Sequence, residues 1–488
     1  MNLARWRLHA AQNSTWQARR LNLRESPALL TAFMILVSLA AGVGAGILSS
    51  ISPLAGFVLV VAVAIGVTML TNALMALMTL VGIIYVLPFG VIPVPIGGVK
   101  FTFIDAAMSL TLLLWLLRIL TRREDRLITS PIDGPLTIFM VLAIACFIFG
   151  IYSVTGEVTR FFFKSINSML FFFSVTNIVR KRQQLTPVVK TVIWGGFAAA
   201  ALALGIYLLP ATTAERLLST LRVVGYPSGS DVLRYIASTE TLRAIGTSID
   251  PNVLGGMLLV VLPLTVASLF GRKALLPRPF LAVAFVTMVL ALILTYSRSS
   301  WVGALAAMLF MGTVRYRRLW ILFAVFLALL FVLPQGDIVL GRIGSGIAAE
   351  DQAAQMRLGE YKDALRLISQ YPWFGVGFGS APSIDLYVAA SSIYLLIAEE
   401  MGLVGLSVFL LTMVVLFVYA LSGLKRIADP LTQTIQLGAM ASLVGALTAG
   451  LFDHYFFNLH FPHTVALFWL FVGLVVVATR LGTAEEKA

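Results

Sequence analysis

The chain of 488 residues is poor in charge and almost devoid of cysteine. Asp, Glu, Lys and Arg make up only 12% of it, about half the share found in soluble proteins. So few charges could not cover the surface of a soluble particle of this size. The one cysteine, Cys146, excludes an intramolecular disulfide and a thiolate metal cluster. These absences exclude cytosolic enzymes, secreted disulfide-rich domains and disordered regulators.

Apolar residues make up 59% of the chain, and its mean hydropathy is +0.95. A membrane-spanning helix needs ~20 mostly apolar residues, and open sheets cannot cross lipid. The sequence therefore predicts an all-α polytopic transmembrane bundle in a lipid bilayer. About fourteen runs are long enough: 28–49, 54–71, 73–92, 102–119, 134–153, 161–179, 188–209, 252–270, 280–297, 300–314, 319–334, 391–421, 433–452 and 463–479.

The net charge of +13 would suggest a nucleic-acid partner in a soluble protein, but here it follows the loops. With the N-terminus in the cytoplasm, the predicted cytoplasmic segments hold 23 of the 35 Lys and Arg residues. This bias is the usual topology signal of membrane proteins. We therefore expect both termini inside and no nucleic-acid partner.

The predicted organisation is a basic cytoplasmic N-terminus at 1–27, a membrane domain at 28–479 and a cytoplasmic tail at 480–488. Two outer segments, about 210–250 and about 335–390, are much longer than the other connections. Loops longer than ~12–15 residues are usually functional or disordered. We expect these two to form small helical caps on the outer face.

Ionisable residues are scarce inside the predicted spans, where they usually mark function. Asp105, Asp133 and Lys164 fall at span ends, and only Glu399 and Glu400 lie clearly inside one. The chemistry is therefore expected at the outer face.

Two arginine-bearing segments border the spans there. In the first, Arg243 precedes Asp250 and Asn252, which read either as simple helix caps or as part of an arginine site that clamps phosphate. In the second, Arg298 lies in the tight turn 295–301 among hydroxyl residues, either as an interfacial anchor or as an anion site.

Two further segments follow along the chain. Arg357, Tyr361 and Leu365 are expected on one face of a helix in the second outer loop, which also reads as an amphipathic surface helix. The segment 391–405 includes Tyr394 and the adjacent pair Glu399 and Glu400. These carboxyl groups are either a catalytic base or partners of an arginine.

These four segments, in this order, resemble the O-antigen ligase and polymerase superfamily of bacterial membrane glycosyltransferases. The family's arginine segment before a helix start resembles 243–252, and its Ser-Arg-Ser turn resembles 297–299. Its arginine-led loop helix ending in Gly-x-Gly resembles 357–379. Its ligase motif, a His followed by Asn, Ser or Gln, nine residues and Gly-x-x-Gly, resembles the run from Ser392 to Gly402 and Gly405, but Ser391 stands at the histidine position.

The resemblance implies attack by a sugar hydroxyl on C1 of a glycan carried on undecaprenyl diphosphate, with inversion and without metal or cofactor. The sequence has no Asp-x-Asp, the usual metal site of soluble nucleotide-sugar transferases. The diphosphate-binding candidates are Arg243, Arg298 and Arg357, supported by Asn252, Tyr361 and Tyr394. A serine at 391 is a poor base, so the candidates for that role are Glu399, Glu400 and Asp363, with His454 or His463 as alternatives.

The missing histidine favours a polymerase of exopolysaccharide or O-antigen over a ligase to lipid A-core. A protein O-oligosaccharyltransferase stays open within the family, and a lipid-linked oligosaccharide flippase is the alternative of another class. The acceptor is thus a glycan, a lipid or a protein. The resemblance further implies the bacterial inner membrane, an active periplasmic face, and a flippase and a chain-length regulator as partners.

Overall fold

The computed structural model describes residues 53–92, 101–120, 127–151, 154–226, 232–236, 241–321, 352–379 and 390–484, with single residues between 39 and 50. Within these ranges the ordered elements are helices, and the strand-like pairings are two isolated bridges, Val91–Thr102 and Tyr235–Leu242. The predicted all-α class is confirmed for the described residues. The spans predicted at 28–49 and 319–334 lie largely outside them.

The chain divides into two compact units, 1–67 and 68–488. The first holds most of the apolar helix α3 (Pro53–Thr71). The second holds the remaining elements: α4 (Ala73–Val86), α5 (Phe103–Leu120), α6 (Asp133–Phe149), α7 (Gly156–Ile178), α8 (Arg182–Tyr207), α9 (Ala211–Thr220), η1 (Leu221–Val224), η3 (Gly246–Ser248), α10 (Pro251–Phe270), α11 (Arg278–Leu294), α12 (Arg298–Val314), α15 (Gln352–Gln370), α16 (Ile393–Leu424), α17 (Pro430–Ala449) and α18 (Pro462–Ala484).

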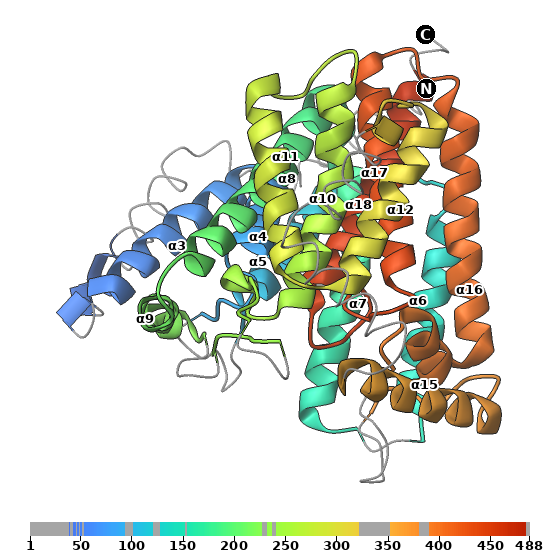
Figure 1. Ribbon diagram of the computed structural model, residues 1–488, viewed down its shortest axis with the longest axis horizontal. Coiled ribbons are helices and arrows are strands. Elements are labelled where there is room, and N and C mark those ends of the chain that lie inside the picture. Colours follow the sequence, from blue (N-terminus) through green and yellow to red (C-terminus); the bar gives the residue numbers. More distant parts are fainter. Residues whose placement is uncertain are drawn as a thin grey trace, which may run out of the picture. The chain divides into compact units, whose positions relative to one another are not determined.

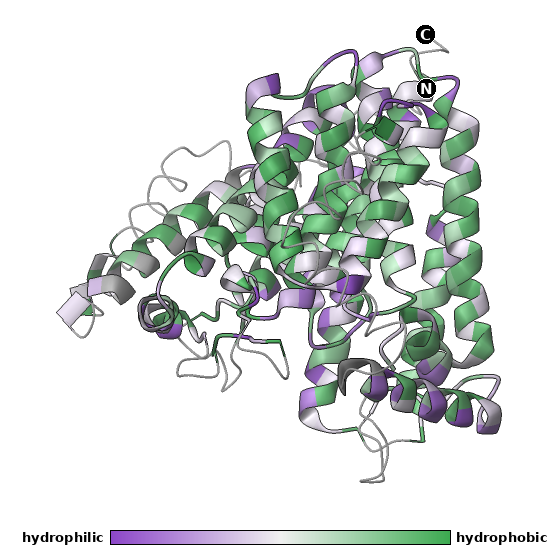
Figure 2. Ribbon diagram, viewed as in Figure 1, coloured by the Kyte–Doolittle hydropathy of each residue, from purple (hydrophilic) through white to green (hydrophobic). Residues whose placement is uncertain are grey.

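Six of the described helices are long and apolar enough to cross a membrane: α5, α7, α8, α10, α16 and α18. α4, α6 and α11 are apolar but shorter. Apolar residues dominate the long helices, whereas α15 is mixed in character (Figure 2). The chain is therefore a multi-pass helical membrane protein, and the expected count of about fourteen spans stays a prediction.

The second unit is built around α10, α12, α17 and α18. α10 and α18 are buried along most of their length. α12 and α17 approach backbone to backbone, since a Cβ added to Gly303 would lie 2.6 Å from the carbonyl oxygen of Gly445. Small residues of this kind let membrane helices pack closely where the hydrophobic effect gives little help.

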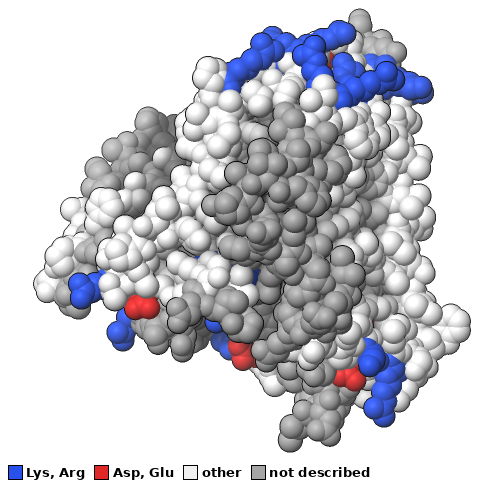
Figure 3. Space-filling view, in the orientation of Figure 1, with Lys and Arg blue, Asp and Glu red and all other residues white. Residues whose placement is uncertain are grey.

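The helices of the second unit share two ends of different character. At one end, the guanidinium of Arg480 donates to the carbonyls of Thr176 and Val179 at 2.9 and 2.6 Å, and Arg182 pairs with Asp429 at 2.6 Å. The first contacts join the last turn of α18 to the last turn of α7, and the ion pair joins the start of α8 to the residue that caps α17. Lys and Arg are dense at this end (Figure 3), which we call the basic end.

The opposite end, which we call the polar end, is formed by the first turns of α10, α12, α16 and α18 and the last turns of α11 and α17. The turn 450–461 connects α17 to α18 there. α15 lies crosswise beside the first turns of α16 at this end (Figure 1). The four segments that carry the family motifs all meet at the polar end.

Candidate functional site

Arg243 is held at the polar end by groups from two helices. Its Nε donates to the carbonyl oxygen of Thr295 at 2.8 Å, and its Nη2 donates to Oδ1 of Asn252 at 2.8 Å. The backbone is fixed as well, because the N–H of Ala244 donates to the carbonyl of Leu294. Asn252 thus anchors the guanidinium of Arg243, and its predicted part in diphosphate binding stays a prediction.

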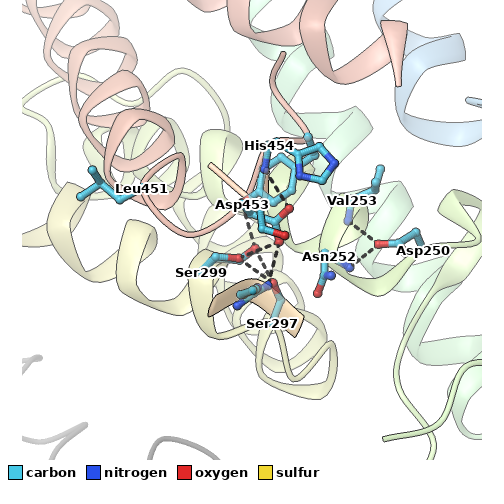
Figure 4. A network of polar contacts seen from close by, with 12 residues as sticks. Asp250, Asn252, Val253, Ser297, Ser299, Leu451, Asp453 and His454 are labelled. Atoms are coloured by element: carbon cyan, nitrogen blue, oxygen red, sulfur yellow. Dashed lines mark hydrogen bonds and ion pairs between the residues drawn. The ribbon is translucent and has the colours of Figure 1, made fainter. Parts of the chain in front are cut away.

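Asp250 caps the start of α10, as the sequence also predicted. Its Oδ1 accepts from the backbone N–H groups of Asn252 at 2.7 Å and Val253 at 3.0 Å (Figure 4). Burial raises the pKa of Asp250, and the charge of Asp453 adds to the rise, while the two amides and Arg243 oppose it. The capping and arginine-site interpretations of this segment are therefore compatible. Asp250 caps the helix start that holds Asn252, and Asn252 in turn holds Arg243.

Three serine hydroxyls form a buried cluster where α11 turns into α12. Ser297 Oγ lies 3.2 Å from Ser299 Oγ and 3.0 Å from Ser300 Oγ, and Ser300 contacts the hydroxyl of Tyr455 at 3.2 Å. Room for them comes from α10, because a side chain at Gly255 would collide with Ser300. The hydroxyls supply donors and acceptors that can adjust to a bound group.

Arg298 is the first residue of α12 and is partly exposed between these buried serines. The preceding Tyr296 has φ of 51°, an uncommon left-handed conformation for a bulky residue. The tight turn therefore holds the Ser-Arg-Ser run in a fixed, strained conformation at the polar end.

Asp453 joins these segments and was missed by the sequence analysis. Its Oδ2 accepts from Nη2 of Arg357 and from Oγ of Ser299, both at 3.3 Å, and its Oδ1 accepts from the N–H of His454 at 2.9 Å (Figure 4). The available signal was an acidic residue at the end of the apolar run 433–452, in a turn that was considered only for its histidines.

α15 is fastened to the start of α16 through Ser391. The N–H of Ser391 donates to Oε2 of Glu360 at 3.0 Å, and Tyr361 donates its hydroxyl to the carbonyls of Ser391 and Leu451, both at 3.1 Å. Burial raises the pKa of Tyr361, opposed by Arg357. The residue at the family's histidine position therefore contributes backbone contacts that seat α15.

The structure corrects the predicted position of Leu365 on α15 and adds a contact for Tyr394 on α16. Leu365, expected on the same face as Arg357, is 57% exposed, and Ala364 is buried in its place. Eight positions of a helix advance ~80° beyond two full turns, so the pair cannot share a face closely. Tyr394 donates its hydroxyl to the carbonyl of Leu447 at 2.8 Å and so braces α16 against α17.

The predicted bases Glu399 and Glu400 lie deeper along α16. Glu399 lies six residues beyond the start of α16 at Ile393, or ~9 Å along the helix axis. Oε2 of Glu400 is buried and has no hydrogen-bond partner among the described residues. Asp363 lies on α15, six residues beyond Arg357 and ~9 Å along the helix. Asp453, which was not among the predicted bases, contacts Arg357 directly at 3.3 Å.

The two histidines offered as alternatives differ in their surroundings. His463 is 1% exposed and packs edge-on against Phe89, with ring centroids 4.8 Å apart. Nδ1 of His454 is buried without a hydrogen-bond partner in the described part of the chain. His463 is therefore a core residue of α18, while His454 adjoins Asp453.

The fold and these contacts define a class: a multi-pass helical membrane protein with an arginine and hydroxyl site at one end of its bundle. Residues 283–410 match the family model Wzy_C, described as O-antigen ligase. The match runs from α11 into α16 and contains Arg298, Arg357, Ser391 and Gly402, whereas Arg243 and Asp453 lie outside it. No curated protein matches the chain. The family match confirms the predicted relation to the O-antigen ligase and polymerase superfamily.

Proposed function

We propose that this protein is an inverting membrane glycosyltransferase that polymerises or transfers a glycan carried on undecaprenyl diphosphate. The polar end is its active face, on the periplasmic side of the bacterial inner membrane. The proposal rests on one observation above all: at the end opposite the basic end, Asp453 joins Ser299 to Arg357, and Arg243 donates to the carbonyl of Thr295 in the same turn as the serines. The family match supports the same class of reaction.

The chemistry requires a place for a leaving diphosphate. The acceptor hydroxyl oxygen attacks C1 of the donor sugar, the bond from C1 to the diphosphate oxygen breaks, and the hydroxyl proton passes to a carboxylate. Arg243, Arg298 and Arg357 stabilise the charge that develops on the diphosphate, since fixed cations in a site of low polarity act strongly. This route needs no metal and no cofactor.

The proton acceptor is a carboxylate near the arginines. Asp363, Glu399 and Glu400 are the candidates from the sequence, and the contact with Arg357 adds Asp453 to them. A carboxylate must lie within hydrogen-bond reach of the acceptor hydroxyl, directly or through one water. Asp453 fits that criterion because it contacts both Arg357 and Ser299, each at 3.3 Å.

The acceptor decides between the related activities. Ser391 stands where the ligase motif has its histidine, and this replacement favours a polymerase of exopolysaccharide or O-antigen. A ligase to lipid A-core and a protein O-oligosaccharyltransferase are the alternatives in the family. A flippase and a chain-length regulator are the expected partners of a polymerase.

A lipid-linked oligosaccharide flippase is the alternative of another class. A flippase that carries a charged headgroup across the bilayer needs polar groups along its path. In the described candidate spans, most charged residues lie near helix ends; Lys164, Lys190, Glu399 and Glu400 lie six to eight residues from the starts of α7, α8 and α16. This distribution favours chemistry at one end of the bundle over transport through it.

The test replaces Arg243, Arg298 and Arg357 singly by Ala and by Lys in a strain that lacks the gene. We expect the Ala variants to reduce polymer formation about 100-fold, the usual cost of losing one transition-state donor, with partial activity for Lys. Surface polysaccharide length and attachment are read on gels. Arg366→Ala is the matched control, because Arg366 is exposed on the same helix, α15. Wild-type product from all three Ala variants contradicts the proposed site.

A further inference from the structure

α16 is broken near its start at Gly402, which has φ 68° and ψ −176°. In a continuous helix, the N–H groups of Leu403 and Val404 would donate to the carbonyls of Glu399 and Glu400. They donate instead to the carbonyls of Pro372 at 2.7 Å and Trp373 at 3.3 Å. The break therefore turns two backbone donors outward, toward the loop that follows α15.

The two carbonyls released by the break are used by the same loop. The carbonyl of Glu399 accepts from the N–H of Val376 at 2.8 Å, and the carbonyl of Glu400 accepts from the N–H of Gly377 at 3.0 Å. All four backbone groups freed in α16 are thus paired with residues 372–377. Buried backbone groups without partners are strongly unfavourable in an apolar environment, so the break and the docked loop depend on each other.

Glycines make this approach sterically feasible on both sides. A Cβ on Gly402 would overlap the carbonyl group of Trp373, and a Cβ on Gly375 would overlap the carbonyl oxygen of Glu399. A Cβ on Gly377 would overlap the backbone of Gly150, at the end of α6. Gly375 and Gly377 also have positive φ, at 67° and 83°, which glycine adopts without strain.

The docked loop begins where α15 ends, and α15 carries Arg357 to the site. α15 is held at two places: through Glu360 and Tyr361 at Ser391, and through its following loop at Gly402. The first anchor point lies just before α16, and the second lies at its break. The run from Ser391 to Gly402 therefore connects two attachments of α15, and the motif has a structural meaning without a base in it.

We propose that Gly375, Gly377 and Gly402 are positioning residues that lock α15 to α16 and so fix Arg357 in the site. The proposal rests on the proposed function for its catalytic consequence. The lock itself is a property of the fold and is testable without any assay of transfer.

The structural test measures the distance between α15 and α16 by electron spin resonance. Spin labels are placed at Lys362→Cys and Leu411→Cys, both exposed, in a Cys146→Ser background that keeps a donor to the carbonyl of Phe374. Gly402→Ala is expected to broaden the distance distribution. Gly82→Ala and Gly205→Ala are matched controls, because an added Cβ there meets nothing within 4 Å, and they should leave it narrow. An unchanged distribution in Gly402→Ala overturns the lock.

The functional test measures transfer from undecaprenyl-diphosphate-linked glycan by the full chain in liposomes. Gly402→Ala and Gly375→Ala are expected to lower kcat by up to about 100-fold, because small misplacements of a clamping group are costly. Arg357→Ala should lower activity while the label distance stays as in the wild type. A broadened distance with normal activity overturns the positioning role, whereas full activity of Arg357→Ala overturns the proposed function.

A measurement on the wild-type protein covers the case in which these variants fail to fold. Hydrogen exchange should show the amides of Val376, Gly377, Leu403 and Val404 protected, as donors of the lock. If these four amides exchange as fast as unprotected amides of the same sequence, the proposal is overturned.

Discussion

At the residue scale, the two arginines whose partners are known in detail are held in different ways. Arg243 donates to neutral acceptors, the carbonyl of Thr295 and the amide oxygen of Asn252. Arg357 pairs with the carboxylate of Asp453. In the proposed site, a diphosphate would compete with the carboxylate of Asp453 for Arg357, and with the oxygens of Thr295 and Asn252 for Arg243.

Asp250 provides a prediction about stability and pH. Because burial raises its pKa in the folded state, the native protein binds this proton more tightly than the unfolded chain. Stability from this group is therefore greatest at acid pH and falls as pH rises from about 3.9, the unfolded value, through the raised folded value. Asp250→Asn keeps the two cap hydrogen bonds and removes the buried charge.

We expect Asp250→Asn to be at least as stable as the wild type at pH 7 and to show a weaker decline between acid and neutral pH. Asp250→Ala loses the cap and about 1 kcal/mol. Thermal unfolding in detergent across the pH range measures both effects. A wild-type pH dependence in Asp250→Asn would show that this carboxyl does not titrate as expected.

Arg243 and Arg298 were predicted as site residues because each stands beside a span boundary, and Arg357 because it begins a helical stretch in the second outer loop. All three segments lie at one end of the bundle, and their role in a site stays a prediction. Asp453 was not predicted, because an aspartate after an apolar run has a ready explanation as a solvated turn residue. Its importance comes from contacts with Arg357 and Ser299, at sequence separations of 96 and 154 residues.

At the scale of elements, hydropathy places the helices but does not reveal where they break. The boundary between α3 and α4 was readable, and Asn72 marks it by accepting from the N–H of Leu74. The run 391–421 was predicted as one span, yet its backbone is interrupted at Gly402. The reason is physical: the interruption depends on a partner loop, 372–377, that no local pattern announces. Residues 403–424 alone are long enough to cross a bilayer of ~30 Å.

The contact between α12 and α17 gives a prediction at this scale. A Cβ on Gly445 would lie 2.7 Å from the carbonyl oxygen of Gly303, so these two backbones touch. Gly303→Val should force the helices apart and cost about 1–3 kcal/mol, the usual range for overpacking. Because α12 begins with Arg298, transfer activity should fall as well.

Thermal unfolding of the purified protein in detergent measures the cost. Gly205→Val serves as the control, since Gly205 lies exposed on α8 and an added Cβ meets nothing within 4 Å. Equal unfolding temperatures for Gly303→Val and Gly205→Val would contradict a tight α12–α17 contact.

At the scale of the whole molecule, the charge of +13 is unevenly distributed between the two ends of the bundle. The basic end carries the dense group of Lys and Arg in Figure 3, and the polar end carries the network of Figure 4. This separation is what the positive-inside rule predicts if the basic end faces the cytoplasm. The predicted topology therefore accounts for the sign of the net charge, and the proposed function rests on a few arginines at the other end.

Single-cysteine labelling tests this orientation in intact cells. Lys362→Cys lies exposed on α15 at the polar end, and Arg426→Cys lies exposed after α16 at the basic end. With Cys146 replaced by Ser, a membrane-impermeant thiol reagent should label Lys362→Cys from outside. It should reach Arg426→Cys only after the membrane is permeabilised. Because a transferase that uses a flipped donor must work on the outer face, labelling in the reverse order would contradict both the orientation and the proposed periplasmic reaction.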